Sequence, residues 1–264
     1  MKTSSWFVSS TLFWGLPPER WFELAATHGL DGLEIWIQQM IIQDISPVRI
    51  RKLAEESGLS LTAHSYSWDM NLISLSNPMR RSAMKLTRRG IDMAAAIGAE
   101  QITIHPGREG LPLAGINLDK MQAESFLSIG RYGKKMGVPV SFEIMEKIPK
   151  ERFTSATAMK AVEACTKGEI CWGYTEDIAH CDTEEEIFDI AKTLKGQISE
   201  FHISNKKGQA RHVADVRGGD FNLPEITRAL SKEGLPMVLE GYDPSMQAER
   251  FEDTWAWLTS ENSD

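Results

Sequence analysis

Eight short β-rich runs, each separated from the next by a longer amphipathic run, are the feature of this sequence that most constrains its fold. The runs cover residues 5–10, 32–36, 59–65, 101–105, 139–145, 171–177, 198–204 and 236–242. Because a helix between two strands returns the chain to its starting side, the strands are expected to pair in parallel. Eight such units favour an α/β fold closed into a single (β/α)8 TIM barrel, with a doubly wound open sheet as the alternative.

Local signals mark where the intervening helices begin and end. Thr183 and Glu186 form the spacing of a capping box, which is typical of a helix start. Glycine stands at seven joints between a helix and the next strand, where a left-handed residue ends a helix. These glycines are Gly29, Gly58, Gly98, Gly137, Gly168, Gly196 and Gly234. A barrel of this type needs about 250 residues, so we expect one domain over residues 1–264.

Charge and cysteine content narrow the class of function. The net charge of −8 disfavours a protein that mainly grips nucleic acid, because a phosphate track needs clustered Lys and Arg. The three cysteines lack a paired motif, which indicates reduced thiols and a cytoplasmic location. No apolar run resembles a signal peptide or reaches the roughly 18 residues of a membrane span, so no membrane association is expected.

Potential metal ligands stand at or near the ends of six successive strand candidates. They are His64, His105, Glu143, Asp177, His202 and Glu240. Any one of them alone is compatible with a structural role, such as a hydrogen-bonded core histidine or a buried ion pair. Together they would ring one mouth of a barrel, the face where this fold carries its active sites. Charged groups inside apolar strands are costly unless they are paired or bind a cation, and this mixture suits Mn²⁺, Mg²⁺, Co²⁺ or Zn²⁺.

Several nearby residues extend this candidate site. His180 follows Asp177 by three positions, so both side chains can turn inward from one short loop. The long polar segment after the seventh strand contains Arg211 and His212, and its length is typical of a substrate-contacting loop. Trp14, Trp36 and Trp68 follow the first three strands; they are candidates for an apolar pocket wall, although core packing is the commoner role of tryptophan.

These motifs resemble the xylose isomerase-like barrel superfamily, from the segment GLDGLEIW to VLEGY. The order Glu143, Asp177, His202 and Glu240 is similar to the single-metal quartet of ketose epimerases, and Asp177 with His180 matches their DxxH element. The resemblance implies one Mn, Mg or Co ion on this quartet, and an isomerase or epimerase of a small sugar or polyhydroxy carbonyl compound that works through a metal-stabilised enediolate. Glu143 and Glu240 would be the acid/base pair, and the substrate contacts would be His180, Arg211, Glu34, Trp36 and Trp68.

Two related activities stay open. An inosose-type dehydratase would use the same enediolate. The segments AHSYSWDMNL and IHPG resemble endonuclease IV, in which His64, His105 and His212 would be further zinc ligands or would support the first site. That family places an aspartate where Ala210 stands and a longer segment before Pro47, so we favour a small-molecule enzyme over a zinc nuclease of abasic DNA. A non-catalytic binding protein and a homo-oligomer are also compatible with the sequence.

Overall fold

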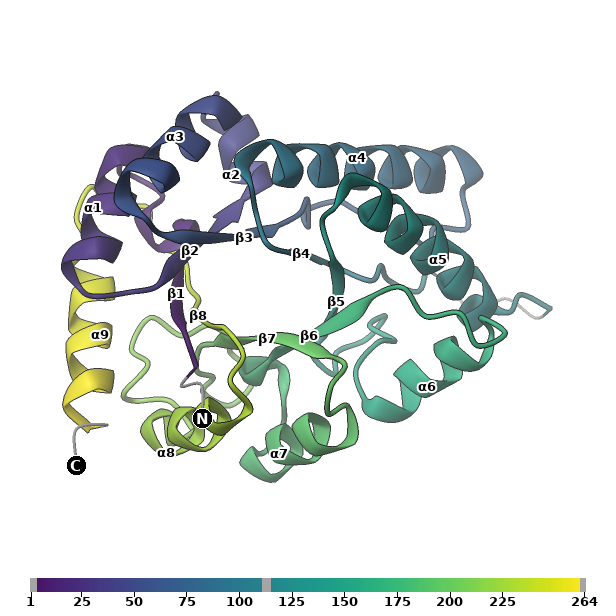
Figure 1. The fold of residues 1–264 in the computed structure, drawn as a ribbon. Helices are drawn as coiled ribbons and strands as arrows, with labels where there is room; N and C mark the ends of the chain where they lie inside the picture. The colour runs from purple at the N-terminus through teal and green to yellow at the C-terminus, as the bar shows by residue number, and fades with distance from the viewer. Residues whose placement is uncertain (1–3, 111–114, 262–264) are drawn as a thin grey trace.

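The computed structural model describes residues 4–110 and 115–261 and contains a closed barrel of eight parallel strands in sequential order (Figure 1). The strands are β1 (Trp6–Ser9), β2 (Gly32–Trp36), β3 (Ser60–His64), β4 (Ile102–Ile104), β5 (Val140–Ile144), β6 (Gly173–Asp177), β7 (Ile198–Ile203) and β8 (Met237–Leu239). All eight strands lie within the ranges predicted from the sequence. The (β/α)8 barrel is therefore confirmed, and the open sheet is excluded because β1 pairs with both β2 and β8.

The helices surround this barrel on its outside (Figure 1). They are α1 (Pro18–Thr27), α2 (Ile37–Ile42), α3 (Pro47–Ser57), α4 (Asn77–Ile97), α5 (Leu118–Met136), α6 (Ala156–Ala164), α7 (Glu184–Thr193), α8 (Leu223–Leu230) and α9 (Glu249–Glu261). Short 3-10 helices, η1 (Ser10–Phe13), η2 (Ile178–His180) and η3 (Ser231–Glu233), tighten three of the connections. None of the helices in these two described ranges is both long and apolar enough to span a bilayer.

Several helices end where the local signals place them, since Gly58, Gly98 and Gly137 directly cap α3, α4 and α5. Gly168 instead stands four residues after α6 ends at Ala164. All seven joint glycines have positive φ angles, which range from 68° at Gly234 to 88° at Gly168. The Thr183 side chain accepts a hydrogen bond from Glu186 N at the start of α7. The Glu186 carboxylate in turn accepts from Asp182 N, one residue before the position expected for a capping box.

Strand register decides which side chains meet inside the barrel. Asp177 at the end of β6 is paired with His202 on β7, and Trp36 on β2 is paired with His64 on β3. Because side chains alternate across a strand, Glu200 faces the same side as His202. The apolar core instead lies between strands and helices, where large side chains such as Phe126, Phe142 and Phe201 are fully buried. The interior of the barrel is therefore left for polar groups.

Candidate functional site

Six carboxylates and five imidazoles meet where the strands end at the mouth of the barrel. The five histidines are His64, His105, His180, His202 and His212, and the six acids are Glu34, Glu143, Glu146, Asp177, Glu200 and Glu240. β4 and β8 stop one residue early, so His105 and Glu240 lie just past their strands. The six strand-end residues singled out in the sequence all belong to this cluster.

Glu143 lies at the centre of the cluster. Its Oε2 is 2.9 Å from His105 Nε2 and 3.3 Å from His64 Nε2. Its Oε1 is 3.6 Å from His180 Nδ1 and 3.9 Å from His202 Nδ1. One carboxylate therefore links two sides of the mouth, and each of its oxygens faces a different pair of imidazoles.

His202 is held from below by carboxylates inside the barrel. Its Nε2 donates to Glu34 Oε2 at 3.1 Å and lies 3.6 Å from Glu200 Oε1. The surrounding carboxylates raise the pKa of His202 well above its ordinary value although burial opposes this, so both ring nitrogens hold protons in the absence of a cation. With the Nε2 proton held by these carboxylates, Nδ1 is the nitrogen that can give up its proton and act as a ligand, the arrangement that orients metal-binding histidines. Nδ1 points to the mouth, 3.4 Å from Glu240 Oε2.

Asp177 and His180 lie together with His212, which comes from the long segment after β7. Asp177 Oδ2 is 3.4 Å from both His180 Nε2 and His212 Nε2, and the two imidazole Nε2 atoms are also 3.4 Å apart. His180 Nδ1 donates to Ile144 O at 2.8 Å, which fixes the ring. His212 has a φ of 51°, an unusual left-handed conformation for a histidine that is often retained at functional sites.

The quartet Glu143, Asp177, His202 and Glu240 fits a divalent cation. Asp177 Oδ2, His202 Nδ1 and Glu240 Oε2 are buried and lack a hydrogen-bond partner among the residues that the structure describes. Glu143, Asp177 and His202 each offer a ligand atom within 4.8 Å of the others. Buried polar atoms without partners are expensive, so their concentration at one point indicates a place for a cation.

The carboxylates at the centre are stabilised in their charged form by imidazoles. Burial alone would raise the pKa of Glu143, but His105 and His64 hold the pKa of that carboxyl well below its usual range. In the same way, His202 outweighs the burial of Glu240 and lowers the pKa of Glu240. Both acids are thus anionic and available as ligands or as proton acceptors.

The pKa values of Asp177, His180 and Glu34 are raised instead. Burial raises the pKa of Asp177, and the carboxylates of Glu240 and Glu143 raise it further. Burial would lower the pKa of His180, yet Asp177 and Glu143 raise it to about 9. Burial also raises the pKa of Glu34. Without a cation, protons held on these groups offset part of the negative charge of the buried carboxylates. A divalent ion would offset the same charge.

Aromatic rings line one side of a cavity of about 370 Å³ above this cluster. Trp36 stacks on His64 with ring centroids 4.1 Å apart, and Trp68 and Trp14 continue the row at 6.2 Å and 5.7 Å. Tyr242, which follows β8, is 5.4 Å from Trp14. Trp36, Trp68 and Tyr242 line the cavity itself, together with Glu143 and Glu240.

Other site residues lie differently from the sequence-based expectation. The described residues that line the cavity do not include Arg211, whose Nη1 donates to Gly208 O and whose Nη2 lies 3.6 Å from Asp182. Arg250 from α9 does line it, and its guanidinium holds the loop through His212 O and Val213 O. Glu34 lies below His202 and outside this cavity's lining residues.

Two acids of the cluster were not singled out in the sequence. Glu200 precedes His202 by two positions, so strand alternation predicts that both face inward. Glu146 follows β5, and its Oε2 lies 3.6 Å from His180 Nε2. The alternation of side chains along the strand could therefore have identified Glu200 from the sequence. Glu146 stands in a loop, and strand periodicity does not predict the path of a loop.

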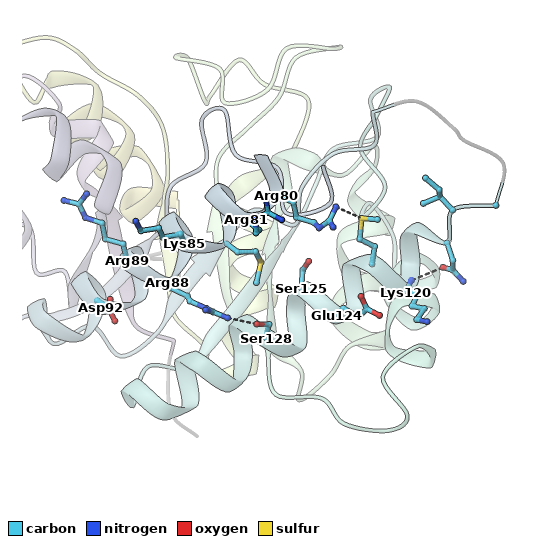
Figure 2. Close-up of a pocket in the computed structure, with 15 residues that line it drawn as sticks. Arg80, Arg81, Lys85, Arg88, Arg89, Asp92, Lys120, Glu124, Ser125 and Ser128 are labelled. Atoms are coloured by element: carbon cyan, nitrogen blue, oxygen red, sulfur yellow. Dashed lines mark hydrogen bonds between the residues drawn. The ribbon is translucent and has the colours of Figure 1, made fainter. Parts of the chain in front are cut away.

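A larger hollow of about 1180 Å³ lies elsewhere, over α4 and α5 on the outer wall (Figure 2). Its side chains include Arg80, Arg81, Lys85, Arg88, Arg89 and Lys120. Figure 2 shows Arg88 bonded to Ser128 across the two helices, at 2.8 Å. We call this surface the α4/α5 groove. It brings together cations without any of the histidines of the mouth.

Known proteins resemble the chain over nearly its whole length. A family model described as "Xylose isomerase-like TIM barrel" matches residues 22–261. Among solved structures, a D-tagatose 3-epimerase-like protein superposes with a TM-score of 0.75 at 18% identity, covering 98% of this chain and 100% of that one. The 3-keto-D-glucoside 4-epimerase from E. coli gives 0.75 at 16% identity, covering 97% and 99%. A D-allulose 3-epimerase from Methylomonas sp. gives 0.72 at 14% identity, covering 97% and 90%. At these identities the superpositions establish a shared fold.

Proposed function

The chain belongs to the xylose isomerase-like TIM barrel family, and from this premise we propose that it is a divalent-metal-dependent isomerase or epimerase of a small sugar or related polyhydroxy carbonyl compound. The observation that carries the proposal is the set of buried atoms without hydrogen-bond partners on Asp177, His202 and Glu240, beside Glu143 and below an aromatic-walled cavity. Structural neighbours named as sugar epimerases support the same class of reaction.

Glu143, Asp177, His202 and Glu240 would hold the cation, and a manganese, magnesium or cobalt ion suits these ligands. Such an ion supplies Lewis acidity that polarises a substrate carbonyl and makes the neighbouring C–H acidic. Glu34 fixes the His202 ring through Nε2, so that Nδ1 faces the mouth. His180, 6% exposed and fixed on Ile144 O, is placed to donate a hydrogen bond from Nε2 to a substrate oxygen.

Glu143 and Glu240 are the acid/base pair of this proposal. Both line the cavity, and both have depressed pKa values, so each is a carboxylate that can accept a proton. One would remove the proton from the carbon next to the carbonyl, and the resulting enediolate would be reprotonated by the same acid or by the other. The aromatic rings of Trp36 and Trp68 restrict water on one side of the cavity.

Exchange of a carbon-bound proton with solvent tests this mechanism directly. The protein is loaded separately with Mn²⁺, Mg²⁺ and Co²⁺ and incubated with ketoses and inososes in D₂O, and deuterium at the carbon beside the carbonyl is followed by NMR. Glu143→Gln and Glu240→Gln are each expected to lower the exchange rate by about 10²–10⁴-fold. Glu163→Gln, a largely buried carboxylate on α6, is the matched control. Exchange that persists in both mouth variants would overturn the assignment.

The nuclease alternative retains one specific observation in its favour. His64, His105 and Glu143 form a second group whose ligand atoms lie within 4.8 Å of one another. The aspartate that the endonuclease IV family places at the position of Ala210 is absent, and the two aspartates that follow it, Asp215 and Asp220, accept hydrogen bonds from Gly218 N and Gly208 N within the same loop. The small-molecule reaction is therefore preferred.

Elemental analysis of the purified protein separates the two candidates. One manganese, magnesium or cobalt ion per chain supports the isomerase or epimerase. Two or three zinc ions, together with incision of an abasic duplex in the presence of zinc, would support the nuclease instead. His105→Ala sharpens the result, because it removes a ligand of the second group and leaves the proposed quartet in place.

A further inference from the structure

We propose that the substrate carries a second sugar unit, a ketose linked to another pyranose or furanose, and that this second unit binds in a separate cavity over the ends of β3, β4 and β5. The inference rests on the proposed function for the reacting sugar, but it concerns a second cavity whose own lining residues, such as Ser67, Asn71 and Arg108, have no role in that function. It follows from the two adjoining cavities of the mouth, from an exposed tryptophan that lines both and from buried polar atoms that lack hydrogen-bond partners.

The mouth holds two adjoining cavities. The first, of about 370 Å³, contains Glu143 and Glu240 and accommodates the reacting unit. The second, of about 590 Å³, is lined by residues that include Ser67, Asn71 and Arg108. Five wall residues are common to both cavities: Trp36, Trp68, His105, His180 and His212. Since the walls are shared, a ligand anchored above the cluster can extend from one cavity into the other.

Trp68 lines both cavities and is partly open to solvent, with Trp14 and Trp36 tilted against it. It is 46% exposed, although its backbone is fixed by Gln38 Oε1, which accepts from Ser67 N and Trp68 N. An exposed tryptophan on a pinned backbone presents a preformed apolar plane. The C–H face of a sugar ring packs on such a plane, since it removes apolar surface from water and meets the negative face of the indole.

Residues that line the second cavity also carry polar atoms that make no hydrogen bond within the described part of the protein; one of them, Glu146 Oε2, lies 3.6 Å from His180 Nε2 in an ion pair. Ser67 Oγ, Glu146 Oε2 and Trp36 Nε1 are buried and have no hydrogen-bond partner in the described ranges of the chain. All three residues line the second cavity. Two are oxygens and one is an N–H donor, and sugar hydroxyls can satisfy both kinds because each hydroxyl donates and accepts. A hydrocarbon group in this cavity would leave the three atoms without a hydrogen bond, which favours a sugar as the second unit.

Binding of single and double sugars tests the proposal. Titration calorimetry on the metal-loaded protein compares D-fructose with lactulose and isomaltulose, in which the fructose unit carries a second sugar. At least one disaccharide is expected to bind about tenfold more tightly than D-fructose, the gain that one aromatic stacking contact contributes. Met70→Trp is the blocking variant, because Met70 lines the second cavity and not the first.

Met70→Trp is expected to abolish the preference for the disaccharide and to leave fructose affinity within about twofold of the parent value. Met79→Trp is the matched control, because Met79 lies on α4 and is 60% exposed. Ser67→Ala is a second variant that adds no bulk, and it should reduce the preference for the disaccharide over D-fructose. Equal or weaker binding of both disaccharides, or a preference that survives Met70→Trp and Ser67→Ala, would overturn the proposal. Preferred binding of a disaccharide without any deuterium exchange would instead refute the proposed reaction and leave the second-unit site standing.

Discussion

The barrel mouth and the α4/α5 groove are both hollow and both charged, but they hold their charges in different ways. The groove is the larger, at about 1180 Å³ against 370 Å³ and 590 Å³ for the two cavities of the mouth. Its Arg81 and Lys85 project into solvent from a helix. At the mouth, by contrast, His202 and Asp177 are fully buried and project from adjacent strands.

The difference shows that the candidate site is distinguished by the burial of uncompensated charge rather than by the size of its hollow. An exposed guanidinium is stabilised by water and needs no partner. A buried carboxylate such as Asp177 gains little from water, so it must take a proton, an imidazole or a cation. The mouth is therefore expected to respond strongly to metal, substitution and pH, and the groove to respond weakly.

Metal binding should give the largest stability effect. A divalent ion at about 100 times its Kd adds about 2.7 kcal/mol to the free energy of unfolding, which corresponds to a Tm increase of about 5–10 °C for a chain of this size. Calorimetric melting with and without chelator measures it. Asp177→Asn, which alters one ligand, should remove most of the increase. An increase of equal size in Asp177→Asn would place the ion outside the quartet.

Glu200 should have the next largest effect, through the orientation of His202. Its Oε1 accepts from Thr103 Oγ1 at 2.6 Å and lies 3.6 Å from His202 Nε2. Glu200→Gln is expected to weaken metal affinity by about 10–100-fold, the usual effect of removing a carboxylate that supports a ligating histidine. Chelator competition measures the Kd. Thr87→Val, at a buried polar position of the outer helix α4, is the control and should leave the Kd unchanged.

Glu151, whose buried carboxylate pairs with Arg108 at the wall of the second cavity, provides a pH-dependent test of the same contrast. Burial raises its pKa to about 7 despite the nearby Arg108. The folded state then holds a proton that the unfolded chain loses near pH 4.5, so the free energy of unfolding falls as pH rises between these values. Urea unfolding at pH 5 and pH 8 should show Glu151→Gln gaining stability relative to the parent at the higher pH. The exposed Glu124→Gln of the groove serves as control; a gain of the same size there would remove burial as the cause.

The groove should give the smallest effects. Arg81→Ala and Lys85→Ala remove exposed cations, so each is expected to change the free energy of unfolding by less than about 0.5 kcal/mol. Deuterium exchange of the proposed substrates should stay at the parent rate. A loss of exchange in either variant would contradict the division between the two regions and connect the groove to the reaction.

Much of the site could be predicted because ligand-type residues are conspicuous in apolar strands. Asp177, His202 and Glu143 stand at or next to strand ends, and parallel strands bring such ends to one face. Glu200 could have been found by the same alternation that places His202. Glu146 and Arg250 could not, since a loop and the last helix bring them to the mouth through tertiary packing.

The sequence by itself determined the eight alternating units, the helix ends and the residue types that converge at the mouth. These features depend on local periodicity, on turn chemistry and on the cost of burying charge, all of which act over a few residues. Only the tertiary structure decided that Glu143 faces four imidazoles, that Arg211 bonds to Gly208 and that Trp68 lines two cavities. The contacts of Glu143 and the place of Trp68 join residues far apart in the chain, and the Arg211 bond, although local, depends on the path of its loop. Strand register and loop paths of this kind are encoded by no local pattern.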